Sequence, residues 1–279
     1  MRALRSTEWL LIGYFSYVAL ISPTRLPLLV LLLAIALVAV LAYGEARGNP
    51  LFFSIARDWA PLLLTLIAYR EMDWFTPLVW DHHLEFRWIL FDRSLLYGWG
   101  LQHAIESAGA VLPSYLEFCY LFVYAVGPFT VTVLYLEHRR NRVNQVLLLY
   151  LLGTLLAYAL FPYFPSQPPR TLFGDSDLPT VMTSIRRFNL WIVNGYGIHS
   201  SVFPSAHVSS AFSAGLALLL YLPNRKRYGL GMLIYAASVS VAAVYGRYHY
   251  AVDVLAGFGV SLVAAFIVFW PRMHTDGHG

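Results

Sequence analysis

The sequence predicts an all-α integral membrane protein, a polytopic helical bundle with about six to eight transmembrane helices. Of its 279 residues, 58% are hydrophobic and only 12% are charged, whereas a soluble domain carries roughly 25% charged residues. The mean hydropathy is positive, and the chain divides into apolar runs of about the length that crosses a bilayer. Because lipid offers no hydrogen-bond partner to backbone groups, these runs are expected to be helices.

The apolar runs differ in how well they fit a membrane span, which needs about 20 apolar residues. The last five runs fit well, whereas the first three are short or interrupted, and the third begins with Arg57-Asp58. We expect these three to be tilted, re-entrant or partly interfacial. The first run has no small-residue cleavage site after it, so it is interpreted as an uncleaved span rather than a signal peptide. In order, the eight candidate spans are residues 8–22, 26–43, 55–69, 115–136, 144–162, 206–222, 229–245 and 252–270.

Two short basic loops predict the orientation of the chain. Residues 139–142 (RRNR) and 224–227 (NRKR) are separated by two candidate spans, so they lie on the same side of the membrane. The positive-inside rule places that side in the cytoplasm. With eight spans, the stretches 70–112 and 163–205 then lie outside. Within the first, residues 84–97 alternate apolar and charged positions at helical spacing, which predicts either an interfacial helix or an ordinary surface helix.

Three segments rich in Arg, Ser, His and Asp follow or precede spans at the predicted outer side. They are residues 163–170 (YFPSQPPR), 203–207 (FPSAH) and 245–253 (YGRYHYAVD). Such residue types serve phosphoryl chemistry, because cationic and hydrogen-bonding groups stabilise the charge on transferring phosphate oxygens. The topology therefore predicts that these distant segments meet at one membrane face.

His249 and Asp253 are four residues apart, which on a helix places them on one face within hydrogen-bonding reach. A carboxylate that accepts from one ring nitrogen leaves the other nitrogen free to act as a nucleophile. The alternative is an Asp that caps a helix start beside an interfacial His.

Ser205 and His207 belong to a Pro-Ser-Ala-His stretch that is typical of a helix N-terminus, where free N–H groups bind anions. There His207 is in a position to protonate a leaving oxygen, and the alternative is simple capping beside an interfacial His. Arg170 follows Pro168-Pro169, and its guanidinium matches phosphate in geometry and charge. For Arg170 and Arg247 the alternative is an arginine that extends its charge to the membrane surface.

The three segments together resemble the type-2 phosphatidic acid phosphatase superfamily. The pattern of that family is an Arg motif, then Pro-Ser-x-His, then His-x-x-x-Asp, and here it reads PPR at 168–170, PSAH at 204–207 and HYAVD at 249–253. The resemblance spans roughly residues 50–270. It is closest to the branch that contains fungal inositol phosphorylceramide synthase and its bacterial relatives, which share the Pro-Pro-Arg and His-Tyr-x-x-Asp forms.

This resemblance implies a reaction through a phosphohistidine. His249 attacks phosphorus, Asp253 orients it and His207 protonates the departing oxygen. The phosphoryl oxygens are bound by cationic and hydroxyl side chains, for which the candidates are Arg170, Ser205 and Arg247. No metal and no cofactor is implied. The expected organisation is N-terminal spans in 1–48, a catalytic membrane domain in 49–270 and a polar tail in 271–279.

Two positions depart from the usual pattern of the superfamily. A Lys is usual seven residues before the motif Arg, and an Arg six residues before the last motif His. Tyr163 and Ala243 stand at these places. Both departures suit the synthase-like branch and weaken an interpretation as a plain phosphatidic acid phosphatase.

The protein is therefore expected to be a lipid phosphatase or phosphotransferase that acts on a phospholipid or lipid phosphate. No nucleic-acid partner is expected. The expected location is the plasma (inner) membrane, with the active site on the extracytoplasmic face. A transporter or channel is the alternative, but the clearest spans carry almost no polar residues. An intramembrane serine protease using Ser205 would leave both histidines unused. His199, Arg186, Arg187 and Asn189 are expected to be solvated loop residues, and His82-His83 to be interfacial rather than metal ligands.

Overall fold

The computed structural model describes residues 4–107, 109–174 and 176–275, with side chains up to residue 270. Within these ranges every regular element is a helix, which confirms the predicted all-α class. In chain order the longer elements are α1 (Ser6–Ile21), α2 (Leu26–Arg47), α3 (Pro50–Glu71), α4 (His83–Arg93), α5 (Leu101–Glu106), α6 (Val111–Leu121), α7 (Val126–Leu136), α8 (Val143–Leu160), α9 (Pro169–Leu172), α10 (Ser184–Tyr196), α11 (Ala206–Tyr221), α12 (Lys226–Tyr245) and α13 (Ala251–Thr275). Short one-turn elements are η1 (Met72–Phe75), η2 (Ser94–Gly98), η3 (Phe122–Ala125), η4 (Arg140–Arg142), η5 (Phe161–Tyr163) and η6 (Pro223–Arg225).

Each of the eight predicted spans coincides with a helix or helix run, and the chain is an integral membrane protein. In the described part of the chain, six runs are long and apolar enough to cross a membrane: Leu26–Arg47, Pro50–Phe75, Val111–Leu136, Arg140–Tyr163, Pro223–Tyr245 and Ala251–Trp270. The sequence-based lengths need two corrections. The second and third spans are full-length helices of 22 residues, and α11 has only 16. A 16-residue helix is about 24 Å long, shorter than a hydrocarbon core of about 30 Å.

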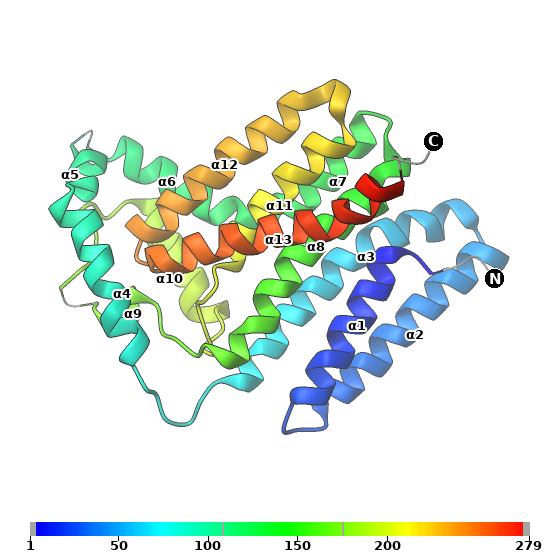
Figure 1. The fold of residues 1–279 in the computed structure, drawn as a ribbon, viewed down its shortest axis with the longest axis horizontal. Coiled ribbons are helices and arrows are strands. Elements are labelled where there is room, and N and C mark those ends of the chain that lie inside the picture. The colour runs from blue at the N-terminus through cyan, green and yellow to red at the C-terminus, as the bar shows by residue number, and fades with distance from the viewer. Residues whose placement is uncertain (1–3, 108, 175, 276–279) are drawn as a thin grey trace.

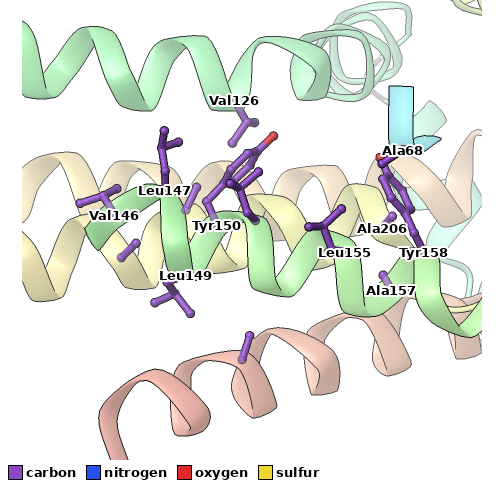
Figure 2. Close-up of a cluster of buried hydrophobic side chains, with 14 of the residues drawn as sticks. Ala68, Val126, Val146, Leu147, Leu149, Tyr150, Leu155, Ala157, Tyr158 and Ala206 are labelled. Carbon is purple, nitrogen blue, oxygen red and sulfur yellow. The ribbon is translucent and has the colours of Figure 1, made fainter. Parts of the chain in front are cut away.

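The centre of the bundle is α11, which packs against α8, α12 and α13. Small residues allow this close packing, as is common between membrane helices. A Cβ atom at Gly153 of α8 would lie 2.0 Å from the Ser213 hydroxyl of α11, so only glycine fits there. The Ser209 hydroxyl also donates to the Gly153 carbonyl at 2.8 Å. Figure 2 shows buried apolar side chains of α8 in the surrounding core, among them Leu147, Tyr150 and Leu155.

The first three helices lie together along one side of the bundle (Figure 1), and an ion network joins them. Buried Arg57 of α3 donates to Glu8 of α1 and Glu45 of α2. Its neighbour Asp58 accepts from Arg5, Arg140 and Tyr135. The interruption that Arg57-Asp58 made in the apolar run is thus explained by pairing, which offsets the cost of burying charge.

Helices α4, α5 and α9 lie toward one end of the bundle in Figure 1. The predicted helix at 84–97 is present as α4 followed by η2. At the C-terminus, α13 continues through Thr275 and so enters the predicted polar tail. Residues 276–279 lie outside the described residues. Ser205, the residue that caps α11, lies close to the second turn of α13 because α13 carries glycine at the contact. A Cβ atom at Gly257 would lie 2.3 Å from the Ser205 carbonyl oxygen.

Candidate active site

A cavity of about 380 Å³ lies between α3, α8, α10, α11 and the segment from α6 to α7. Arg170, His207 and His249 line one end of it, together with Tyr120, Tyr124 and Tyr248. The remainder is lined mainly by apolar and aromatic side chains of α3, α7 and α8. A small set of polar groups in a mostly apolar cavity of this size is typical of a small-molecule site.

His207 lies in the first turn of α11. Ser205 caps that helix, with its hydroxyl accepting from the Val208 amide at 3.4 Å. The imidazole of His207 stacks on Tyr120, with ring centroids 5.0 Å apart, and meets the Tyr124 ring edge-on at 5.6 Å. Its Nε2 atom is buried without a hydrogen-bond partner in the protein. The ring is thus fixed by stacking while one nitrogen remains available to a ligand.

His249 faces His207, with 5.4 Å between their ring centroids. Its Nδ1 atom lies 3.0 Å from the Val202 carbonyl oxygen and 3.4 Å from Asp253 Oδ2. Since a carbonyl only accepts, Nδ1 carries the proton, and Nε2 keeps its lone pair. The sequence indicated Asp253 as the partner of one ring nitrogen of His249, but nothing in it pointed to the nearer Val202 carbonyl. Burial lowers the pKa of His249 well below its ordinary value, and His207 and Arg170 lower it further.

Asp253 is fully buried in the first turn of α13 and holds the local backbone together. Its Oδ2 atom accepts from the Tyr250 amide at 2.8 Å. Its carbonyl oxygen accepts from the Ser205 amide at 2.9 Å, which ties the second motif segment to the third. The predicted spacing of His249 and Asp253 therefore does place the two side chains side by side.

Arg170 lies in α9, directly after the two prolines. Its amide donates to the Arg247 carbonyl at 3.0 Å, and its guanidinium lies 5.5 Å from the centre of the Tyr248 ring. The Nε atom is buried and has no hydrogen-bond partner in the protein. Among the described residues that line the cavity, Arg170 is the only Arg or Lys.

Ser205 and Arg247 do not line the cavity. Ser205 is fully buried and its hydroxyl serves the cap of α11. The guanidinium of Arg247 is buried against Asp92 of α4 at 2.7 Å and lies 3.7 Å from Asp177. Arg247 also adopts a left-handed backbone conformation with φ of 61°, which is uncommon for a side chain of this size. The structure thus brings four predicted residues together, namely Arg170, His207, His249 and Asp253, and places these two behind them.

A buried polar cluster behind the site was missed by the sequence reasoning. Glu117 of α6 accepts from Arg186 at 2.6 Å, from Asn189 at 2.7 Å and from the Tyr248 hydroxyl at 2.6 Å. The expectation that Arg186 and Asn189 are solvated was wrong, because one face of α10 packs on α6. His199 and Arg187 are exposed, as expected. The amphipathic pattern of residues 184–196 was the signal available for the buried face.

Tyr248 links that cluster to His207. Its ring stacks on Tyr120 with 3.9 Å between centroids, and Tyr120 in turn stacks on His207. Burial raises the pKa of Tyr248, and Glu117 raises it further, so the hydroxyl stays protonated and donates to Glu117. No group of His, Cys, Asp and Glu side chains that could hold a metal ion occurs among the residues that the structure describes.

Comparison with known proteins gives one family match and two short likenesses. The family model of the PAP2 superfamily matches residues 87–267. A PA-phosphatase related-family protein from Dictyostelium discoideum is 40% identical over 60 residues, which is 22% of this chain and 10% of that protein. The bacitracin transport permease protein BcrC from Bacillus licheniformis is 34% identical over 68 residues, 24% of this chain and 32% of that protein. The aligned part thus spans a third or less of either relative. No solved structure matches the chain.

Proposed function

Because the chain belongs to the PAP2 superfamily, we propose that it is a membrane-embedded lipid phosphatase or phosphotransferase. The observation that carries the proposal is the polar end of the cavity. There, two imidazole rings face each other beside the guanidinium of Arg170. In the proposed organisation, residues 49–270 form the catalytic membrane domain.

The proposed reaction has two steps. In the first, Nε2 of His249 attacks phosphorus, the bond from phosphorus to the lipid oxygen breaks, and His207 gives its proton to that oxygen. In the second, His207 takes a proton from water or from an acceptor hydroxyl, whose oxygen attacks phosphorus and frees His249. The Val202 carbonyl and Asp253 hold Nδ1 of His249 in its protonated form throughout.

Stabilisation of the transferring phosphoryl group is assigned to Arg170 and to the N-terminus of α11. The guanidinium of Arg170 lines the cavity, and the free amides at the start of a helix attract anions. Ser205 supports this end by capping α11, and Arg247 supports the loop that carries His249. In this proposal, Ser205 and Arg247 therefore support the residues that bind phosphate and do not contact phosphate themselves.

The finer proposal is head-group transfer, as in the inositol phosphorylceramide synthase-like branch. Tyr163 replaces the usual motif Lys and is 59% exposed, and Ala243 replaces the usual motif Arg. With Arg170 as the only Arg or Lys among the described lining residues, the site favours a phosphoryl group with one negative charge, which is a phosphodiester. The likeness to a transport permease covers a short segment, and the mostly apolar cavity favours lipid chemistry over a polar transport path.

The test compares leaving groups in two histidine variants. An alkoxide needs a proton as it departs, whereas a nitrophenolate needs little. His207→Ala is therefore expected to lose about 10²–10⁴-fold in turnover of a phospholipid and far less with nitrophenyl phosphate. His249→Ala is expected to lose both activities.

Labelled substrate completes the test. An acid-labile, base-stable label should be trapped on the wild-type protein and be absent from His249→Ala. Trapped label on His249→Ala would overturn the assignment of the nucleophile. Phosphate release compared with head-group transfer, over a panel of phosphatidic acids and phosphodiester lipids, separates a phosphatase from a transferase.

A further inference from the structure

The side chain of Arg170 rests against an aromatic ring at the polar end of the cavity. Its Cζ atom lies over the ring of Tyr248, 5.5 Å from the ring centre. Its Nε atom is buried without a hydrogen-bond partner in the protein. A guanidinium held by a ring keeps its N–H donors available for a phosphoryl group. The place of Arg170 in the cavity therefore depends on how firmly Tyr248 is held.

Three contacts fix the ring of Tyr248. It stacks on the Tyr120 ring with 3.9 Å between centroids and 12° between planes. A Cβ atom at Gly246 would lie 2.3 Å from the Tyr248 ring, so the ring packs on the backbone where only glycine fits. The hydroxyl donates to Glu117 at 2.6 Å. Because Tyr248 is also only 1% exposed, its ring has little room to turn.

Glu117 on α6 is held in turn by two side chains of α10. Arg186 donates to its Oε1 atom at 2.6 Å, and Asn189 donates to its Oε2 atom at 2.7 Å. All three side chains are buried. A buried carboxylate with several donors stays in one place, because the loss of any donor would leave polar groups unsatisfied. The hydroxyl of Tyr248 thus meets a fixed acceptor.

The charge of Glu117 also strengthens the attraction between Tyr248 and Arg170. A hydroxyl that donates to a buried carboxylate is polarised, and more negative charge then lies on the phenol ring. A cation over the ring is attracted by that charge, most strongly where water is excluded. Arg186 lies 5.8 Å from the same ring centre, but it is paired with Glu117 and so competes little with Arg170.

We propose that Tyr248, anchored by Glu117, is a positioning residue that holds Arg170 in place for the phosphoryl group. The proposal rests on the function proposed above, in which Arg170 binds that group. Glu117 does not line the cavity, so it acts on the substrate only through Tyr248 and Arg170. Tyr248 does line the cavity, and the experiment therefore has to separate positioning of Arg170 from direct contact with phosphate.

Tyr248→Phe tests the anchor with the smallest change, because it keeps the ring and leaves Glu117 its two other partners. The affinity of the full-length protein for vanadate, a phosphate mimic, is expected to fall about 3–10-fold. Tyr248→Leu removes the ring as well and should lower the affinity about 10–30-fold. Tyr245→Phe is the matched control. It removes a hydroxyl that donates to Glu106 at 3.1 Å, and Tyr245 is similarly buried but does not line the cavity. The control should bind vanadate as the wild type does.

A double-mutant cycle shows whether Tyr248 acts through Arg170. The dissociation constant for vanadate is measured for Tyr248→Phe in the wild-type protein and in Arg170→Ala. The loss should be present in the wild-type protein and absent in Arg170→Ala, which has no guanidinium left to position. An equal loss in both backgrounds would overturn the proposal, because it would reveal direct contact of Tyr248 with phosphate or a general loosening of the site.

Turnover gives a second measurement that does not need Arg170→Ala. In Tyr248→Phe, kcat/KM should fall by the same factor for a phospholipid and for nitrophenyl phosphate, since Arg170 binds the phosphoryl group of both. A loss confined to the phospholipid would indicate an effect through Tyr120 on His207 and would overturn the route through Arg170. Equal behaviour of Tyr248→Phe and Tyr245→Phe in an active protein would overturn the positioning role alone. A wild-type protein that neither binds vanadate nor turns over either substrate would instead overturn the proposed function.

Discussion

The ion pair between Asp92 and Arg247 offers a quantitative test of what Arg247 does. Both side chains are buried, at 0% and 1% exposure, and Nη1 of Arg247 lies 2.7 Å from Asp92 Oδ2. The other oxygen of Asp92 accepts from the Ala251 amide at 2.9 Å, at the start of α13. The pair therefore brackets the loop that carries His249. We predict that Arg247 positions this loop and does not itself bind phosphate.

The expected loss of stability depends on which buried charge each substitution leaves unpaired. Asp92→Asn keeps an acceptor for Ala251 but leaves the buried guanidinium without its main partner, which typically costs about 3–5 kcal/mol. Because Asp177 lies 3.7 Å from the same guanidinium, we expect a cost of about 3 kcal/mol, at the lower end of that range. Burial raises the pKa of Asp92 even beside Arg247. In Arg247→Gln the carboxyl can therefore take up a proton, and the cost should be about 1–2 kcal/mol.

The double variant Asp92→Asn/Arg247→Gln removes both charges and keeps an amide-to-amide hydrogen bond. The double variant should lose about 2 kcal/mol of stability. This loss is about 2–3 kcal/mol smaller than the sum of the losses in the two single variants. Thermal unfolding in detergent measures this, at roughly 2–4 °C per kcal/mol in chains of 150–250 residues. Turnover of nitrophenyl phosphate should fall in Asp92→Asn and recover substantially in the double variant. If the stability losses were additive, or if the double variant were as inactive as Asp92→Asn, the positioning role would be refuted and direct contact of Arg247 with phosphate would be favoured.

Two further predictions concern the nucleophile and the orientation. Because the pKa of His249 is lowered by burial first and by His207 and Arg170 next, its neutral, nucleophilic form persists as the pH falls below 6.5, so the acid limb of kcat/KM should lie below that value. His207→Gln removes one of the causes that lower the pKa of His249. The acid limb of nitrophenyl phosphate turnover should therefore move to higher pH in this variant. Ionisation of the substrate cannot explain such a shift, because the substrate is the same for both proteins. For orientation, cysteines at the exposed positions Ser176 and Lys226, introduced in a Cys119→Ser background, should react with an impermeant reagent from opposite sides of the membrane. Labelling of both from one side of intact cells would contradict the proposed extracytoplasmic site.

Much of the fold could be predicted because the signal for a membrane helix lies within the sequence of that helix. Runs of apolar residues near 20 long have one stable backbone conformation in lipid, so the eight predicted spans all coincide with helices. Their lengths were harder to predict. The buried pairs of Arg57 with Glu8 and Glu45 let α3 extend through charges that seemed to interrupt it. Pairing depends on which helices are neighbours, and the sequence of one helix does not contain that information.

The sequence by itself indicated the four residues that meet at the candidate site, namely Arg170, His207, His249 and Asp253. It did not indicate Val202 or the polar cluster around Glu117. The spacing of His249 and Asp253, the Ser205 cap of α11 and the prolines before Arg170 are all local features with local physical causes. Only the tertiary structure decided how they are used. It placed the His207 and His249 rings 5.4 Å apart, gave Nδ1 of His249 a carbonyl partner in Val202, paired Arg247 with Asp92 and made α3 one wall of the cavity. These contacts join residues tens to more than a hundred positions apart, and they depend on how helices pack. Helix packing depends on side-chain volumes and on small residues, such as Gly153 and Gly257, that allow helices to approach closely. These contacts form only in the complete fold, so no local sequence pattern predicts them.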